Sequence, residues 1–195
     1  MSNRLARTLS ILGHPLLSLP VAALLLAGND GAGATRLSML ALGLGVIAIG
    51  VMAYSHWQVR RNRWQHVDAS SRAERRTLNR FLLVLFSAAA IIAWMLSPQR
   101  EFALGLGLSA LLVAAAMLSA RWCKLSLHVA FAMYAAMLLV QLSWLACATG
   151  VAFAGAVAWS RLVLARHVPR DLVAGAVAGL LAGIGFWRLL PFVAA

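Results

Sequence analysis

Long apolar runs separated by short polar segments dominate this sequence of 195 residues. They cover about 9–27, 37–54, 81–97, 102–120, 129–159 and 171–190. The fifth run is long enough for two short crossings, with Gly150 near its middle and the position of the turn left open. Because 63% of the residues are hydrophobic and only 11% are charged, a soluble domain is excluded. The pattern predicts an all-α, polytopic membrane helix bundle of about 6–7 transmembrane helices in a single domain.

The first run follows Arg4 and Arg7, as the apolar part of a signal peptide would. Pro15 and Pro20 interrupt it, however, and no clear A-x-A cleavage site follows. We therefore expect an uncleaved membrane span. We expect His14, within this run, to be a packed or interfacial residue.

A stripe of small residues marks the last run. Gly175, Gly179 and Gly183 recur every four residues and so share one face of a helix. Small residues at this spacing let two membrane helices approach closely. The stripe predicts tight packing of the last helix against a neighbour.

Three polar segments, 56–80, 121–128 and 160–171, fall on the same side of the membrane when the spans are counted in order. Four of the five histidines also lie on that side. The third segment holds a hydroxyl, three arginines, His167 and Asp171 within twelve positions. His167 and Asp171 are four residues apart, so the carboxylate can contact one imidazole nitrogen and leave the other available as a nucleophile. The sequence therefore predicts one polar site at a membrane surface.

The spacing of Ser160, Arg161, His167 and Asp171 resembles SRxxxxxHxxxD, the third signature motif of the type 2 phosphatidic acid phosphatase and vanadium haloperoxidase superfamily. The second motif, PSGH, resembles 125–128 here, where Ser126 and His128 are present but the Pro and Gly are not. The missing glycine puts close approach of the backbone to phosphate in doubt.

The first motif, KxxxxxxRP, is the most altered of the three. Arg75 has the right spacing, but Asp68 stands in place of the lysine and Arg76 in place of the proline. A carboxylate cannot hold phosphate, so we expect Arg72 and Lys124 to supply the missing charge and Asp68 to orient an arginine. A solvated basic loop that follows the positive-inside rule is the alternative interpretation of this segment.

The resemblance implies a metal-independent hydrolase that removes phosphate from a lipid phosphomonoester or diphosphate through a phosphohistidine. It implies that His167 is the nucleophile, Asp171 its support and His128 the proton donor to the leaving group. The phosphate-binding residues that we expect are Arg161, Ser126, Lys124, Arg75, Arg72 and Ser160. No cofactor, metal or nucleic acid is expected, and the expected partners are a lipid phosphate and the bilayer.

Basic residues favour one orientation in the membrane. Fourteen of the seventeen lie on the side of the three polar segments, so the positive-inside rule predicts a site facing the cytoplasm of a bacterial inner membrane. Relatives commonly face the periplasm or lumen instead. Two other readings stay open: a catalytically inactive homologue that binds lipid or acts as a scaffold, and a small transporter or haem-binding protein that uses His14 or His56.

Overall fold

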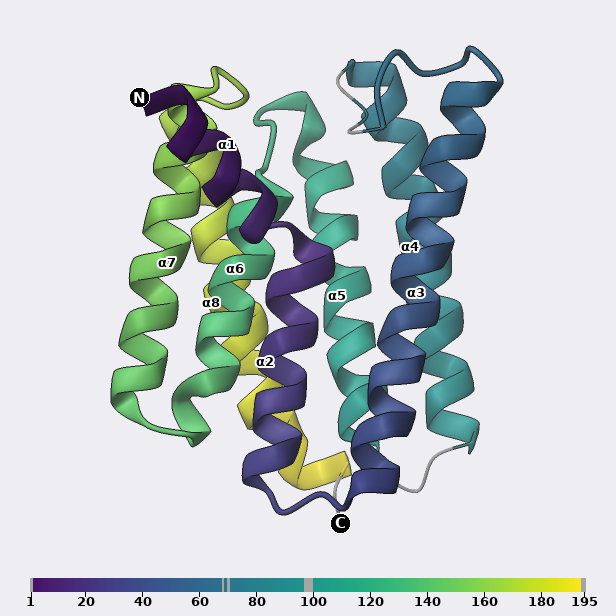
Figure 1. The fold of residues 1–195 in the computed structure, drawn as a ribbon, viewed down its shortest axis with the longest axis vertical. Coiled ribbons are helices and arrows are strands. Elements are labelled where there is room, and N and C mark those ends of the chain that lie inside the picture. Colours follow the sequence, from purple (N-terminus) through teal and green to yellow (C-terminus); the bar gives the residue numbers. More distant parts are fainter. Residues whose placement is uncertain (1, 68, 70, 97–99, 194–195) are drawn as a thin grey trace.

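The computed structural model describes residues 2–67, 69, 71–96 and 100–193, and within these ranges it is built from helices. The α-helices are α1 (Ser2–Leu12), α2 (Pro15–Asn29), α3 (Ala34–Arg60), α4 (Arg72–Leu96), α5 (Glu101–Leu118), α6 (Leu127–Leu138), α7 (Trp144–Val163) and α8 (Pro169–Val193). Short 3₁₀ turns, η1 (Ser119–Arg121) and η2 (Leu139–Gln141), extend α5 and α6. Figure 1 shows the bundle.

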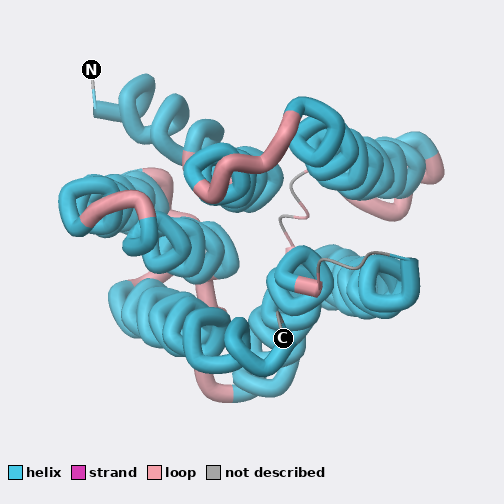
Figure 2. Tube along the Cα trace, turned by 90° about the horizontal axis from the view of Figure 1, so that it is seen from below, coloured by secondary structure: helices cyan, strands magenta, loops and turns pink. Residues whose placement is uncertain are grey.

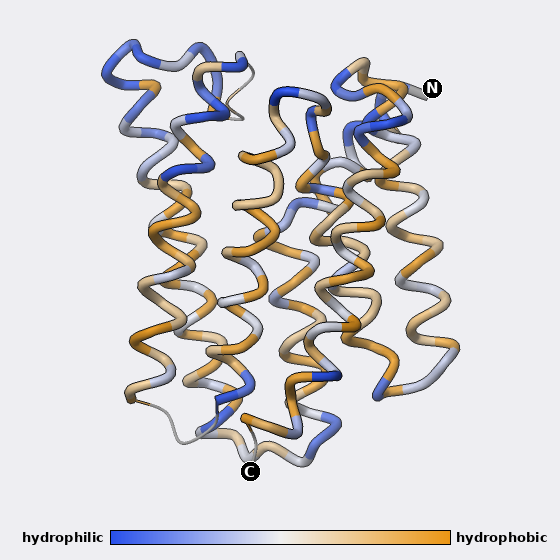
Figure 3. The backbone as a smooth tube through the Cα atoms, turned by 180° about the vertical axis from the view of Figure 1, so that it is seen from behind, coloured by the Kyte–Doolittle hydropathy of each residue, from blue (hydrophilic) through white to orange (hydrophobic). Residues whose placement is uncertain are grey.

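The long helices run up and down, so that their connections gather at two ends (Figure 1). One end carries the α3–α4, α5–α6 and α7–α8 connections together with the N-terminus, and we call it the motif end. All three polar segments identified in the sequence lie there. In Figure 3 hydrophilic residues concentrate at the ends of the bundle, and apolar residues fill the middle.

Five helices are long and apolar enough to cross a membrane: α3, α4, α5 with its 3₁₀ extension, α7 and α8. The pair α1 and α2 passes the same test together, although its axis bends by 51° at a short break. The remaining apolar helix, 127–141, is shorter. The predicted all-helical membrane bundle is thus confirmed, and the chain is a multi-pass integral membrane protein.

One detail differs from the sequence-based expectation, and the structure locates a turn that the sequence left open. The first run is not one straight span, because the chain breaks between Leu12 and Pro15 and restarts as a new helix. The run 129–159 does form two helices, with the turn near Ser143, whose hydroxyl accepts a hydrogen bond from the Ala146 N–H at 3.0 Å and caps α7. Gly150 instead lies within α7.

The predicted tight packing of the last helix is confirmed: α8 lies against α6 along its glycines. A Cβ added to Gly179 would lie 2.2 Å from the carbonyl oxygen of Ala130, and one added to Gly183 would lie 2.2 Å from Met137 Cβ. At the motif end, a Cβ on Gly175 would lie 2.6 Å from the carbonyl oxygen of Ser126. The two backbones therefore touch, which fixes how the beginning of α6 sits beside the beginning of α8. Figure 2 views the helices from below, nearly along their axes.

Candidate active site

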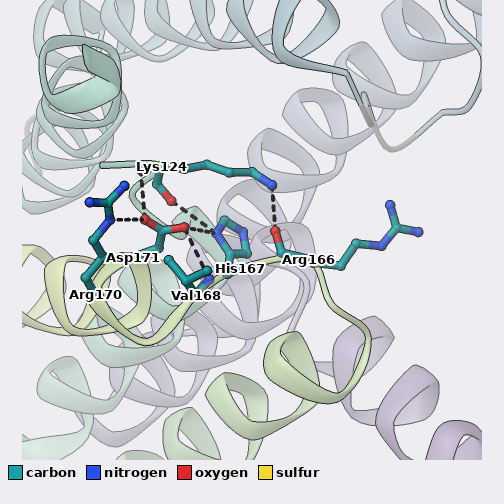
Figure 4. A network of polar contacts seen from close by, with 6 residues as sticks. All are labelled: Lys124, Arg166, His167, Val168, Arg170 and Asp171. Carbon is teal, nitrogen blue, oxygen red and sulfur yellow. Dashed lines mark hydrogen bonds and ion pairs between the residues drawn. The ribbon is translucent and has the colours of Figure 1, made fainter. Parts of the chain in front are cut away.

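The second and third sequence motifs meet at the motif end, where α6 and α8 both begin. The backbone N–H of Ser126 donates to the backbone carbonyl of Asp171 at 3.1 Å. The backbone N–H of Lys124 donates to Asp171 Oδ1 at 2.9 Å. These bonds, together with the glycine contacts between α6 and α8, hold the two motifs side by side (Figure 4).

Asp171 is the buried centre of this network, with 3% of its surface exposed. It lies in the first turn of α8, where a carboxylate is favoured by the helix dipole. Its Oδ1 accepts the hydrogen bond from Lys124 and lies 3.8 Å from Arg170 Nε (Figure 4). Its Oδ2 accepts a hydrogen bond from the Val168 N–H at 3.4 Å. Hydrogen bonds and a nearby cation thus compensate for the burial of this carboxylate.

His167 presents a defined tautomer to the site. Its Nδ1 lies 3.1 Å from the carbonyl oxygen of Lys124 and 3.5 Å from Asp171 Oδ2. Both oxygens accept hydrogen bonds, so Nδ1 carries the hydrogen and Nε2 carries the lone pair. The sequence predicted that Asp171 would orient the ring; the Lys124 carbonyl is the nearer acceptor and shares this role.

Burial lowers the pKa of His167 from 6.5 to about 4, helped by the charges of Lys124 and Arg161. The hydrogen bond and charge of Asp171 offset part of this shift. His167 is therefore neutral at pH 7, and its Nε2 lone pair can attack an electrophile.

The lowered pKa of His167 makes stability depend on pH. Between pH 6.5 and pH 4 the unfolded chain binds a proton at this histidine that the folded chain does not. The contribution of His167 to stability should therefore be constant above pH 6.5 and fall as the pH drops toward 4, by at most about 1.4 kcal/mol per pH unit for this one proton. Thermal unfolding in detergent across this window should show a smaller acid-induced loss for His167→Gln than for the wild type. An equal loss in both proteins would contradict the assignment.

The side chain of Lys124 extends from the same network to the loop between α7 and α8. Its Nζ donates to the carbonyl oxygen of Arg166 at 2.5 Å (Figure 4). Burial lowers the pKa of Lys124, the charge of Arg75 lowers it further, and Asp171 opposes the shift. Arg161 and Arg166 act in the same direction as Arg75. Several cationic side chains thus converge beside the Asp171 carboxylate, an arrangement suited to binding a multiply charged anion.

Ser126 precedes α6 as its N-cap, yet its hydroxyl makes no capping hydrogen bond. The residue is completely buried, and no hydrogen-bond partner for Oγ lies within the described part of the chain. An N-cap serine normally bonds its own helix, and a buried hydroxyl without a partner is costly. The hydroxyl and the first N–H groups of α6 are suited to bind oxyanions.

His128 and Arg161 complete the group of motif residues. His128 lies in the first turn of α6, within electrostatic range of Arg161 and His167. Arg161 lies in the last turn of α7, and its Nη1 donates to Ser10 Oγ at 2.7 Å. The nucleophile candidate, the proton-donor candidate and an arginine thus lie at one site, as the sequence predicted.

Ser160 has a different environment from the one expected. Its buried hydroxyl donates to the carbonyl oxygen of Val157 at 2.7 Å, inside α7. A hydroxyl has one hydrogen to donate, and this bond uses it. Ser160 is therefore omitted from the phosphate ligands proposed below.

The first-motif residues reach the site in part. Arg75 is half-buried in the first turns of α4 and interacts electrostatically with Lys124 and Asp171. Arg72 begins α4, is exposed, and acts on Arg75 through its charge. Asp68, expected to orient an arginine, lies outside the described residues.

The loop that carries His167 contains a residue in a strained backbone conformation. Ala165, exposed just after α7, has φ of 51°, a left-handed conformation that glycine adopts at no steric cost. Ala165→Gly should therefore stabilise the protein by about 1 kcal/mol, visible as a higher melting temperature in detergent. Asn62, with φ of 54°, provides a comparison: asparagine tolerates this conformation better, so Asn62→Gly should gain less. A lower melting temperature for Ala165→Gly would contradict this account.

Sequence reasoning missed three contacts at this site: the Lys124 carbonyl with His167, Ser10 with Arg161, and the ring of His14 with the ring of His128. The first involves a backbone atom, for which no side-chain pattern exists. The other two come from the N-terminal run, whose only signal was the helix-breaking triplet Gly13-His14-Pro15.

Comparisons with known proteins identify no relative: no protein-family profile, curated protein or solved structure matches the chain. Among the described residues, no three His, Cys, Asp or Glu side chains are grouped as metal ligands.

Proposed function

We propose that this protein is a membrane phosphatase that hydrolyses a lipid phosphomonoester or diphosphate through a phosphohistidine. The observation that carries the proposal is the fixed tautomer of His167. The Lys124 carbonyl and Asp171 hold its Nδ1–H, which leaves the lone pair on Nε2, and the charges of Lys124 and Arg161, two proposed phosphate ligands, act on the same ring. The spacing of the third motif supports the same assignment.

The first chemical step is attack of His167 Nε2 on phosphorus. A P–N bond forms as the P–O bond to the leaving group breaks, and His128 gives the leaving oxygen a proton. Positive charge that develops on the imidazole is stabilised through Nδ1–H by the Lys124 carbonyl and the Asp171 carboxylate.

The second step regenerates the enzyme. His128, now deprotonated, takes a proton from water as the water oxygen attacks phosphorus, the P–N bond breaks, and inorganic phosphate leaves. Arg161, Arg75, Lys124 and Ser126 would hold the phosphate oxygens in both steps, with Arg72 adding charge at the rim. Phosphoryl transfer requires mainly this positioning and charge stabilisation.

The position of the site favours a lipid substrate. It lies at the end of membrane-spanning helices, where a lipid tail can remain in the bilayer while its headgroup enters the site. Trp122, directly after η1, and Trp159, near the end of α7, are exposed, as expected for side chains at the depth of the headgroups. The candidate substrates are phosphatidic acid, phosphatidylglycerol phosphate and a prenyl phosphate or diphosphate.

The positive-inside rule supports a cytoplasmic orientation of the motif end. Fourteen basic residues belong to that side and three to the other. Nine basic residues remain on the motif side, against three on the other, when four proposed phosphate ligands and a neighbouring arginine are left out. These five are Arg72, Arg75, Arg76, Lys124 and Arg161. Cysteine labelling from either side of a sealed vesicle, at the exposed Ala73, would test this orientation.

Phosphate release from a panel of lipid phosphates in detergent, with and without EDTA, tests the function. We expect turnover of at least one member, with activity that persists in EDTA. A purified, folded protein that binds these lipids and hydrolyses none would favour the inactive, lipid-binding homologue.

A further inference from the structure

The break between α1 and α2 is a built feature at the motif end. A Cβ on Gly13 would lie 2.3 Å from Val157 Cγ2, so α7 packs where only a glycine fits. Pro15 is the first residue of α2 and restricts His14 before it to an extended conformation, with φ of −64° and ψ of 136°. The backbone position of His14 is therefore fixed from both sides.

From this fixed position the side chain of His14 contacts both its own helix and the ring of His128. Its Nδ1 accepts a hydrogen bond from the Leu16 N–H at 3.2 Å and so caps α2. Its ring meets the ring of His128 edge to face, with centroids 5.2 Å apart and an interplanar angle of 87°. The first contact is structural, and the second involves the proposed proton donor.

One helical turn earlier, Ser10 contacts a second motif residue. Its Oγ accepts the 2.7 Å hydrogen bond from Arg161 Nη1, which joins residues 151 apart in sequence. The N-terminal segment thus touches both a phosphate ligand and the proton donor of the proposed reaction, and none of the three motifs contains a residue of this segment.

We propose that the α1–α2 break is a fourth segment of the active site, in which His14 positions the imidazole of His128 and Ser10 positions the guanidinium of Arg161. This inference rests on the proposed phosphatase function. An edge-to-face contact restricts how the His128 ring rotates, and proton delivery to the leaving oxygen depends on that rotation. The serine accepts a hydrogen bond from Nη1 of Arg161 and so fixes one arm of the guanidinium that would bind phosphate.

Two variants separate the capping role of His14 from its ring contact. His14→Asn keeps a good N-cap and removes the ring, whereas His14→Phe keeps an aromatic ring and removes the cap. Asparagine should preserve the melting temperature but impair proton delivery. His14→Phe should lower the melting temperature, because it loses the capping hydrogen bond from the Leu16 N–H, but it should keep the packing against His128. His14→Ser is a second variant that retains the cap, should asparagine fail to accumulate.

The readout is the rate of the first turnover with two phosphate esters. An alkyl lipid phosphate needs a proton on its leaving oxygen, and p-nitrophenyl phosphate does not, because nitrophenolate is a stable anion. His14→Asn should slow the alkyl ester about 10- to 100-fold and the nitrophenyl ester less than about 3-fold. In His14→Phe, the ratio of the rates with the two esters should stay closer to the wild-type ratio than it does in His14→Asn.

Ser10→Ala tests the second contact. Loss of the hydrogen bond that orients Arg161 should raise KM about 5-fold with little change in kcat. Thr8→Ala is the matched control, because the exposed Thr8 hydroxyl donates to the Arg4 carbonyl within its own helix.

The outcomes distinguish this inference from the function on which it rests. Equal losses on both esters in His14→Asn, or wild-type rates in both His14→Asn and His14→Phe, would overturn the positioning role while the phosphatase stands. An unchanged KM in Ser10→Ala would overturn the role of Ser10. A wild-type protein that hydrolyses neither ester would overturn the proposed function, and the inference with it.

Discussion

His167→Asn is expected to lower phosphate release by at least about 1,000-fold, because it removes the nucleophile of the proposed reaction. The asparagine amide can still donate a hydrogen bond to the Lys124 carbonyl, as Nδ1 of His167 does, so the loop should keep its structure. The measurement is release of inorganic phosphate from a lipid phosphate in detergent, with melting temperatures recorded in parallel at pH 7.

The matched control for this variant is His56→Asn. His56 is exposed near the end of α3, and the same substitution there removes an imidazole at the motif end that the proposed chemistry does not use. Activity of His56→Asn should stay within about 3-fold of the wild type. If both variants retained full activity, His167 would not be the nucleophile.

Gly179→Ala is expected to destabilise the protein by about 3 kcal/mol or more, the largest stability effect that the fold predicts for adding a single methyl group. The added Cβ would lie 2.2 Å from the Ala130 carbonyl oxygen and 2.9 Å from Met133 Cβ. The closest atom belongs to the backbone of α6, so it cannot move aside as a flexible side chain can. The two helices must separate, and thermal unfolding in detergent measures the cost.

Gly107→Ala is the control for this experiment. Gly107 also lies inside a membrane helix, α5, but a Cβ there meets nothing within 4 Å. It should leave stability unchanged or raise it by about 0.5–1 kcal/mol, because alanine favours a helix more than glycine does. Equal effects at Gly107 and Gly179 would contradict the close contact of α6 and α8.

Features set by local periodicity could be predicted from the sequence. The apolar runs gave the helices and their alternation, because backbone groups in a bilayer must bond within a helix. The four-residue spacing of the glycines predicted a packing face, and the structure identifies α6 as the partner. The four-residue spacing of His167 and Asp171 also predicted that their side chains would meet, and they do, at 3.5 Å.

Features set by backbone atoms or by distant segments could not be predicted. The Lys124 carbonyl orients His167, but every residue of the chain has a backbone carbonyl. The sequence therefore does not indicate which of them lies beside His167. The contact of Ser10 with Arg161 depends on the direction of the bend between α1 and α2. Pro15 and Pro20 indicated an interruption of the run but not its direction. Ser160 matched its motif position, yet its hydroxyl bonds inside α7.

The central claim is that His167 becomes phosphorylated, and trapping that intermediate tests it most directly. His128→Asn should still form the phosphohistidine from p-nitrophenyl phosphate, whose leaving group needs no proton, and should hydrolyse it slowly because water is no longer activated. Mass spectrometry after a base quench should therefore find one acid-labile phosphoryl group on the peptide that contains His167. A phosphoryl group on another residue, or none on a protein that still releases a stoichiometric burst of nitrophenolate, would contradict the account.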